Sequence, residues 1–157
     1  MSEFNTMDVF GEVEKASASK GAQYIRPGKH IFDIQKILLR PSGRDTSRLF
    51  FIVELESISS SRSDQPHGST RSWIVDMSRK ETGPSNVKGF AMALGPDIKE
   101  EDITKEDLNK LVGEDQPARG IRVSCDAWEI ETRTGNPFTK VKWDFWGEKM
   151  VPDYHNS

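Results

Sequence analysis

The sequence predicts a mainly β, α+β fold: a five-stranded Greek-key barrel with a helical insertion between strands 3 and 4. Apolar and polar residues alternate with a period of two in three segments within residues 29–77 and in two within residues 120–147, which is typical of half-buried strands. Between these stretches the period changes to 3.6, which is typical of helices. At 157 residues, the chain is long enough for one domain with a sizeable core.

Three strands are expected before the insertion. A turn at Pro27 and Gly28 leads into the first strand, residues 29–40, and polar loops separate it from strands over residues 48–58 and 70–77. A strict period of two divides the apolar residues of the first strand between two faces, with Phe32, Ile34 and Leu38 on one and Ile31, Ile37 and Leu39 on the other. The first two strands should form a hairpin, and the third should pair back onto it.

Two helices are expected within the insertion. The first has Ser85 as its N-cap and ends at Gly95 and Pro96. Its apolar residues recur at helical spacing: Val87, Phe90, Ala91 and Leu94. The second begins with a capping box formed by Thr104 and Asp107, and its outer face carries most of an acidic run.

Two strands follow the insertion, joined by a turn in which Gly135 and Asn136 can take positive φ. The fourth strand, residues 120–132, has one face of small apolar residues: Ile121, Val123, Cys125 and Ala127. The last strand, residues 138–147, has a predicted core face of Thr139, Val141, Trp143 and Phe145. Lys140 and Lys142 must then point outward, because successive side chains on a strand alternate between its faces.

This order of elements is that of an OB-fold, a five-stranded Greek-key barrel. In that fold the second and third strands, with the loops joining strands 1 to 2 and 4 to 5, form the binding surface. A β-sandwich with a helical excursion is the alternative. The expected organisation is a mobile N-terminal lead-in over residues 1–23, an OB-like domain over residues 24–147 and a flexible tail over residues 148–157.

The net charge of −3 is unevenly distributed along the chain. Residues 97–115 hold eight acids against three lysines, a local charge of −5, and the rest of the chain therefore sums to +2. Residues 20–96 hold twelve Lys and Arg against seven acids, which is +5. An acidic protein with a mildly basic face is therefore expected.

Composition argues against a membrane or secreted protein. The sequence has no run of about 18 apolar residues, and its first residues carry acids where a signal peptide would be basic and then apolar. Cys125 is the only cysteine and cannot form an internal disulfide, which fits a reducing compartment. A protein that is soluble and not secreted, without a membrane partner, is the expectation.

Catalysis has little support in the sequence. His30, His67 and His155 lack the spacing of metal ligands, and no nucleophile elbow is present. The stretch GPSNVKG, residues 83–89, lacks the glycine before Lys88 and the Ser or Thr after it that a phosphate-binding loop requires. We therefore predict no enzyme activity, no catalytic residues, no bound metal and no cofactor.

Nucleic-acid binding fits better. A single strand is bound without strict sequence choice by cations that contact phosphates and by exposed rings on which bases stack. The predicted contacts with phosphates are Arg44 and Arg48 in the first loop, Arg71 and Arg122 in strands, Arg133 in the last turn, and Lys140 and Lys142. The predicted stacking rings are Trp73, Trp128, Phe138 and Trp146. The alternative role for each ring is packing in the core, and Trp73 could point either way. The prediction therefore rests on the grouping of rings with cations and not on any single residue.

Several short blocks, read in order, resemble one group of proteins: YIRPGKH (24–30), FFIVELES (50–57), SW (72–73), NVKGFAMALG (86–95) and GNPFTKVKW (135–143). Over residues 24–146 the chain is similar to single-stranded DNA-binding proteins of tailed bacteriophages. The resemblance implies an OB-fold, cooperative coating of displaced strands in phage DNA replication or recombination, and the host cytoplasm as location. It implies phage replication proteins as partners and leaves homo-oligomerisation open. One departure concerns the C-terminal tail. Replicative single-strand binders commonly end in an acidic tail that recruits replication enzymes, whereas VPDYHNS is only weakly acidic.

The first functional hypothesis is therefore a sequence-tolerant, salt-sensitive binder of single-stranded DNA. The second is a phage structural or adaptor protein that binds other proteins through its exposed aromatic residues and the loop 59–69, with its acidic helix against a basic partner. The surface arrangement distinguishes the two. A groove lined with cations and rings favours DNA, whereas a flat apolar patch rimmed by mixed charge favours protein.

Overall fold

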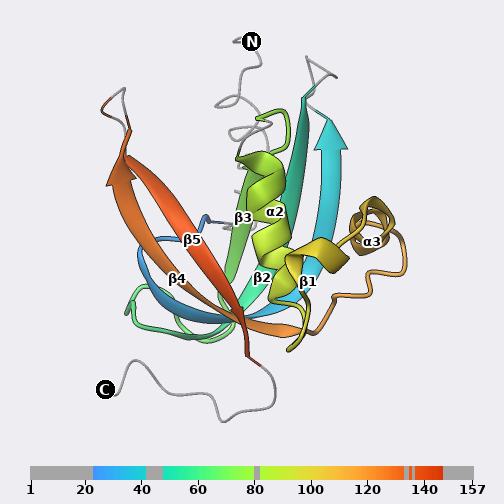
Figure 1. Cartoon of the computed structure of the whole chain (residues 1–157). Helices are drawn as coiled ribbons and strands as arrows, with labels where there is room; N and C mark the ends of the chain where they lie inside the picture. Colours follow the sequence, from blue (N-terminus) through green and yellow to red (C-terminus); the bar gives the residue numbers. More distant parts are fainter. Residues whose placement is uncertain (1–22, 42–47, 80–81, 133–134, 136, 147–157) are drawn as a thin grey trace.

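A computed structural model describes residues 23–41, 48–79, 82–132, 135 and 137–146 (Figure 1). The predicted lead-in apart from residue 23 and the predicted tail lie outside these residues, as do Arg44 and Arg133. Five strands are present: β1 (Gly28–Pro41), β2 (Leu49–Ser60), β3 (Thr70–Asp76), β4 (Arg122–Glu131) and β5 (Pro137–Phe145). Between β3 and β4 lie α2 (Gly83–Met92), the 3₁₀ turn η1 (Glu100–Asp102) and α3 (Lys105–Leu111). The mainly β composition and the helical insertion are confirmed.

The strands form one antiparallel sheet in the order β3-β2-β1-β4-β5. The central strand β1 pairs with β2 along most of its length and with β4 along its first six residues. β3 and β5 are the edges, and no backbone pairing joins them among the described strands, so the sheet is open. None of the helices in the described part of the chain is long and apolar enough to cross a membrane.

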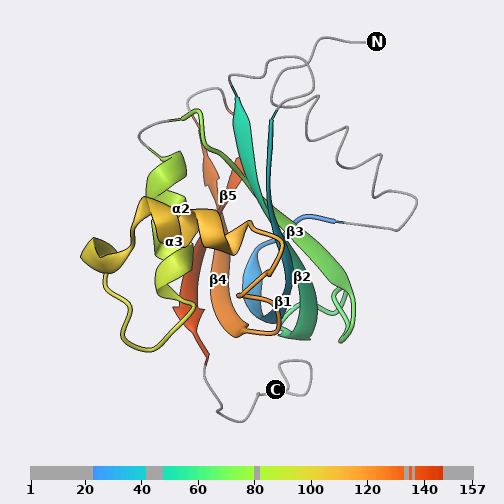
Figure 2. The same ribbon diagram turned by 90° about the vertical axis from the view of Figure 1, so that its right-hand side faces the viewer.

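The open sheet is strongly curled, and α2 lies in its hollow (Figures 1 and 2). The rings of Trp73 in β3 and Trp143 in β5, which come from opposite edges, have centroids 5.2 Å apart. Phe90 of α2 packs edge-on against Trp143 at 5.1 Å and tilted against Trp73 at 5.4 Å. Phe90 is fully buried, so this aromatic cluster joins the two edges of the sheet through the helix.

The first strand departs from strict alternation. Gln35 is an extra residue in β1, because Ile34 pairs with Leu55 and Lys36 already pairs with Glu54. Such a bulge shifts the phase of the side chains by one residue. Ile37 therefore joins Phe32 and Ile34 in the main core, whereas Leu38 packs with Phe50 and Ile52, so the predicted faces of Ile37 and Leu38 are both wrong.

Beyond Asp33, β1 no longer pairs with β4, and the segment between α3 and β4 lies beside it instead. The amide nitrogen of Ile37 donates to Oε1 of Gln116 at 2.7 Å, and Nε2 of Gln116 donates to the carbonyl oxygen of Ile37 at 2.8 Å. Gly120 donates from its amide to the carbonyl of Ile34 at 2.8 Å. The segment after α3 thus satisfies backbone groups of β1 that β4 does not reach.

The helices follow the sequence pattern, but both ends of α2 differ from the prediction, and the helix ends at Met92, before the predicted stop at Gly95 and Pro96. α2 begins at Gly83 with Thr82 as N-cap, not after Ser85, since Gly83 allows the chain to turn tightly against β3, where a Cβ atom would collide with the carbonyl oxygen of Asp76. In α3 the predicted capping box is confirmed. The amide of Asp107 donates to Oγ1 of Thr104 at 3.1 Å, and the amide of Thr104 donates to the Asp107 carboxylate at 3.0 Å.

Candidate nucleic-acid interface

The outward face of the β4–β5 hairpin carries exposed rings beside lysines. Four residues of the hairpin are buried in the core: Val123, Cys125, Ala127 and Trp143. Because successive side chains alternate along each strand, the residues that alternate with these four point outward. We define the hairpin face by four of these outward residues: Trp128, Phe138, Lys140 and Lys142. Trp128 is 44% exposed and Phe138 is 51% exposed.

Strand register sets the neighbours on the hairpin face. Trp128 lies directly opposite Lys140, and Phe138 lies opposite Ile130, two residues further along the hairpin. Opposed residues in antiparallel strands hold their Cβ atoms about 4.5–5.5 Å apart, and diagonal ones about 7–8 Å apart. The face therefore places one cation between two exposed rings.

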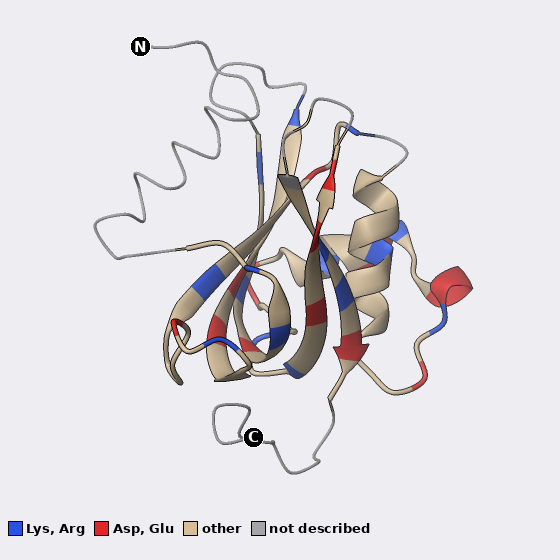
Figure 3. Cartoon of the chain, turned by 90° about the vertical axis from the view of Figure 1, so that its left-hand side faces the viewer, with Lys and Arg blue, Asp and Glu red and all other residues tan. Residues whose placement is uncertain are grey.

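Charges on this side of the molecule are mixed, as Figure 3 shows for the side of β4 and β5. Lys142 lies opposite Asp126, whose neighbour on β1 is Lys29. Neither Lys140 nor Lys142 forms an ion pair within 4.0 Å among the residues described. Both ammonium groups are exposed and available to a polyanion.

Two arginines that were predicted to contact phosphates, Arg48 and Arg122, already form ion pairs with carboxylates. Arg122 binds Asp33 through two hydrogen bonds of 2.7 and 3.1 Å, and this pairing raises the pKa of the Arg122 guanidinium. Arg48 forms an ion pair with the Asp76 carboxylate and lies 5.8 Å from the ring centroid of Phe50. A phosphate would have to compete with these carboxylates.

The other predicted residues lie in different surroundings. Trp73 is half-buried in the aromatic cluster under α2, so its ring packs within the core. Arg71 is 5% exposed and donates to the carbonyl oxygens of Thr70 and Asp64 at 2.6 and 3.2 Å. Trp146 is half-buried just beyond β5. The structure thus brings together Trp128, Phe138, Lys140 and Lys142 and places Trp73 elsewhere.

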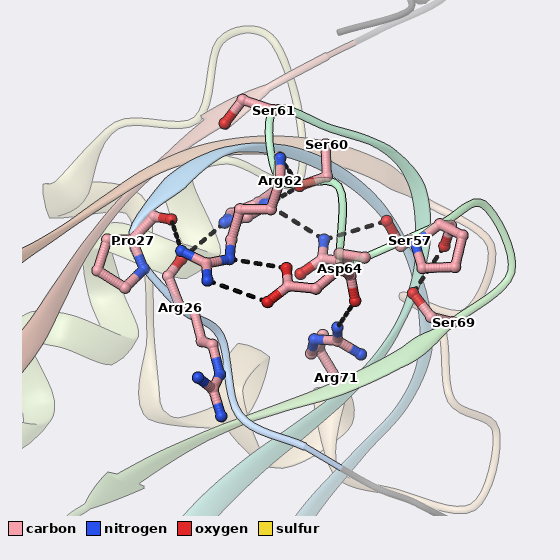
Figure 4. A network of polar contacts seen from close by, with 12 residues as sticks. Arg26, Pro27, Ser57, Ser60, Ser61, Arg62, Asp64, Ser69 and Arg71 are labelled. Atoms are coloured by element: carbon pink, nitrogen blue, oxygen red, sulfur yellow. Dashed lines mark hydrogen bonds and ion pairs between the residues drawn. The ribbon is translucent and has the colours of Figure 1, made fainter. Parts of the chain in front are cut away.

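Sequence reasoning missed a buried polar cluster where β1 begins (Figure 4). The predicted loop 59–69 is observed at residues 61–69, where it folds back over this end of the sheet, and the side chain of Gln65 is fully buried. Nε2 of Gln65 lies 3.1 Å from both Oγ of Ser57 and Nδ1 of His30. The only sequence signal was His30 at a strand entrance.

His30 is held as a neutral imidazole. Nε2 lies 2.8 Å from the carbonyl oxygen of Arg26, which can only accept, so Nε2 carries the proton. Nδ1 then accepts from Oγ of Ser60 at 2.8 Å and from Gln65. Burial lowers the pKa of His30, and the positive charges of Arg62 and Arg71 lower it further, while the Arg26 hydrogen bond and Asp126 act in the opposite direction.

The free energy of unfolding should fall as the pH drops below about 6.5, the ordinary pKa of histidine. In the window between this value and the lowered pKa of folded His30, the unfolded chain binds one more proton, so acidification favours unfolding. Urea unfolding at pH 7.5 and 5.5 measures this loss. His30→Gln should reduce the loss, whereas His67→Gln, at an exposed histidine, should retain it. An equal loss in the His30 variant would contradict the assignment.

Other chemistry has little basis in the described residues. They contain no group of three or more His, Cys, Asp or Glu side chains placed to hold a metal ion. Cys125 is buried, and burial raises the pKa of its thiol well above the ordinary value, so the reactive thiolate is disfavoured. Comparison with protein-family models and with curated proteins finds no match to this sequence.

Proposed function

We propose that the protein binds single-stranded DNA without strict sequence preference, through the hairpin face. The observation that carries this proposal is the register of β4 and β5, which places exposed Trp128 opposite Lys140, without an ion pair among the described residues, and exposed Phe138 on the diagonal. Stacking of one base on an aromatic ring contributes about 1–3 kcal/mol and tolerates every base. Lysines beside the rings contact the phosphates between stacked bases.

The fold that this proposal assumes is an OB-like barrel whose closure passes through α2. Two observations support it: the strand order makes β3 and β5 the two edges that would meet on closure, and the ring contact between Trp73 and Trp143 joins those edges beside the helix. The proposed setting is phage DNA replication or recombination in the host cytoplasm, without enzyme activity. The support for this setting is the resemblance in sequence to single-stranded DNA-binding proteins of phages.

Titration with oligo-dT at low salt is expected to quench the tryptophan fluorescence to saturation. Trp143 is buried, Trp73 is packed under α2 and Trp146 is half-buried, so Trp128, the most exposed of the four, should contribute most of the change. Raising the salt concentration should weaken binding, because each neutralised phosphate releases counterions. The double variant Lys140→Ala/Lys142→Ala should bind more weakly and with a smaller salt slope, by about 0.7 for each phosphate that is no longer neutralised.

A matched control is Lys99→Ala/Lys105→Ala. It removes two exposed lysines from the helical insertion and changes the net charge by the same amount. If binding depends on net charge alone, both double variants will weaken it equally. Absence of any response to oligo-dT at low salt would refute single-strand binding.

A second candidate function, protein docking, rests on a hollow in the helical insertion. The hollow has a volume of about 510 Å³ and lies among α2, η1 and α3. Apolar side chains line most of it, and its charged lining residues are three acids and one lysine: Asp97, Asp102, Asp107 and Lys110. Such a hollow fits an adaptor that receives a basic, partly apolar segment of another protein. In the titration above, this candidate predicts no response to oligo-dT.

A further inference from the structure

Three arginines from separate segments gather around one carboxylate at the start of β1. Figure 4 shows Arg26, Arg62 and Arg71 around Asp64. Arg26 precedes β1, Arg62 and Asp64 lie in the loop after β2, and Arg71 lies in β3. With one acid among three guanidinium groups, this arginine cluster has a net charge of +2.

Two members of the arginine cluster are fixed in place. Arg62 donates to the Asp64 carboxylate through Nε at 2.9 Å and a terminal nitrogen at 3.0 Å, and it also donates to the carbonyl oxygen of Pro27 at 3.0 Å. Arg71 is held by the carbonyl oxygens of Thr70 and Asp64. A ligand would therefore meet two guanidinium groups that are already ordered, which reduces the entropy lost on binding, and at Arg62 it would compete with the Asp64 carboxylate as it would at Arg48 and Arg122.

The arginine cluster retains donors without partners. The guanidinium of Arg26 is exposed and forms no hydrogen bond or ion pair within the described part of the chain. Nε of Arg71 is buried and has no hydrogen-bond partner there either. Burial lowers the pKa of Arg71, and the neighbouring charges of Arg26 and Arg62 add to this effect, against the opposing charge of Asp64. An additional anion would relieve this surplus of positive charge.

The strand β1 links the arginine cluster to the β4–β5 hairpin. Lys29 pairs with Asp126 and Gly28 pairs with Ala127 in the ladder between β1 and β4. The segment before β1 leaves this ladder at Gly28 and runs to β3, where Tyr24 forms a bridge with Ser72 and the Ser72 amide donates to the carbonyl oxygen of Gln23. Lys29 lies opposite Asp126, which in turn lies opposite Lys142 of the hairpin face. A DNA strand that leaves the hairpin face past Lys29 would meet the start of β1, where the arginine cluster lies.

We propose that the arginine cluster is a phosphate site that extends the hairpin face, with Arg26 as the movable contact and Arg62 and Arg71 as fixed ones. The ligand class is a phosphodiester of single-stranded DNA. The site rests on the proposed function for its ligand, but its affinity for a phosphate oxyanion can be measured separately. Arginine suits this role because its planar guanidinium binds two phosphate oxygens at once.

The first test uses Arg26→Ala in the full chain. Only the backbone oxygen of Arg26 contacts His30, so the variant keeps that hydrogen bond and should fold. Its oligo-dT affinity, read by anisotropy of a labelled oligonucleotide, should fall, and the salt slope should decrease by about 0.7. Arg26→Lys should retain most of the slope, and Lys99→Ala, at an exposed lysine of the insertion, should leave both quantities unchanged. An unaltered slope in Arg26→Ala would overturn the proposal.

The second test separates the site from DNA binding. Inorganic phosphate is titrated at constant ionic strength while NMR follows the arginine Nε–H resonances. Saturable shifts at Arg62 and Arg71, absent in Arg26→Ala, would support the site even if oligo-dT does not bind, in which case only the proposed function fails. If oligo-dT binds through Lys140 and Lys142 but phosphate moves neither resonance and Arg26→Ala keeps its slope, the arginine cluster is structural and this inference fails alone.

Discussion

Replacing Phe90 with Ala is expected to lower the free energy of unfolding by about 3–5 kcal/mol, the usual cost of removing a buried phenylalanine. Phe90 is fully buried, and its ring packs against three others: Phe51 at 6.1 Å, Trp73 at 5.4 Å and Trp143 at 5.1 Å. These partners belong to β2, β3 and β5. One substitution would therefore remove packing between the helix and both edges of the sheet.

Urea unfolding followed by circular dichroism measures this effect. Met92→Ala is the matched control, because Met92 lies in the same helix, is exposed and has similar size. It should change the free energy of unfolding by less than about 1 kcal/mol, as is usual for surface positions. If Phe90→Ala and Met92→Ala cost the same, α2 does not hold the edges of the sheet together.

Replacing Trp128 with Ala is expected to weaken oligo-dT binding about 5- to 150-fold, which corresponds to the loss of one stack of about 1–3 kcal/mol. Trp128 has the exposed indole of the hairpin face, and Lys140 lies opposite it, where the proposed binding would place its charge against the same nucleotide. Phe138→Ala should produce a second loss in the same range. Because Trp128→Ala removes the main fluorescent reporter, anisotropy of a labelled oligonucleotide is the measurement.

Trp128→Phe is the informative control, since it keeps an aromatic ring and should retain most of the affinity. Unfolding curves for each variant show whether the sheet remains intact. Equal binding by wild type, Trp128→Ala and Phe138→Ala would show that bases do not stack on the hairpin face. In that case the lysines alone could not account for a defined binding mode.

Most of the fold was predictable because its strands alternate clearly. Predicted and observed strand bounds differ by at most two residues, and the capping box of Thr104 and Asp107 marked the start of α3 correctly. The bulge at Gln35 was not predictable, since one inserted residue leaves no mark in an apolar run such as that of β1. The role of Gln116 was not predictable either. Its φ is 44°, a conformation more common for glycine, and its side chain bonds to the backbone of Ile37 in β1, 79 residues away in sequence.

The candidate site was predictable only in part. The outward direction of Lys140 and Lys142 followed from Trp143 being in the core, and the structure confirms it. The pairing of Arg122 with Asp33 and of Arg48 with Asp76 joins residues distant in sequence, which alternation within a strand cannot reveal. The same holds for the arginine cluster, whose members come from three segments.

The pairing of β1 with β4 has a consequence for the order of folding. β1 and β2 can form a hairpin early because one loop connects them, whereas Asp33 and Arg122 lie 89 residues apart in sequence. Closing so long a segment costs chain entropy before any stabilising contact forms. Such non-local pairing slows folding. The β4–β5 hairpin therefore docks late, and a chain emerging from the ribosome acquires its hairpin face only after the whole insertion has been synthesised.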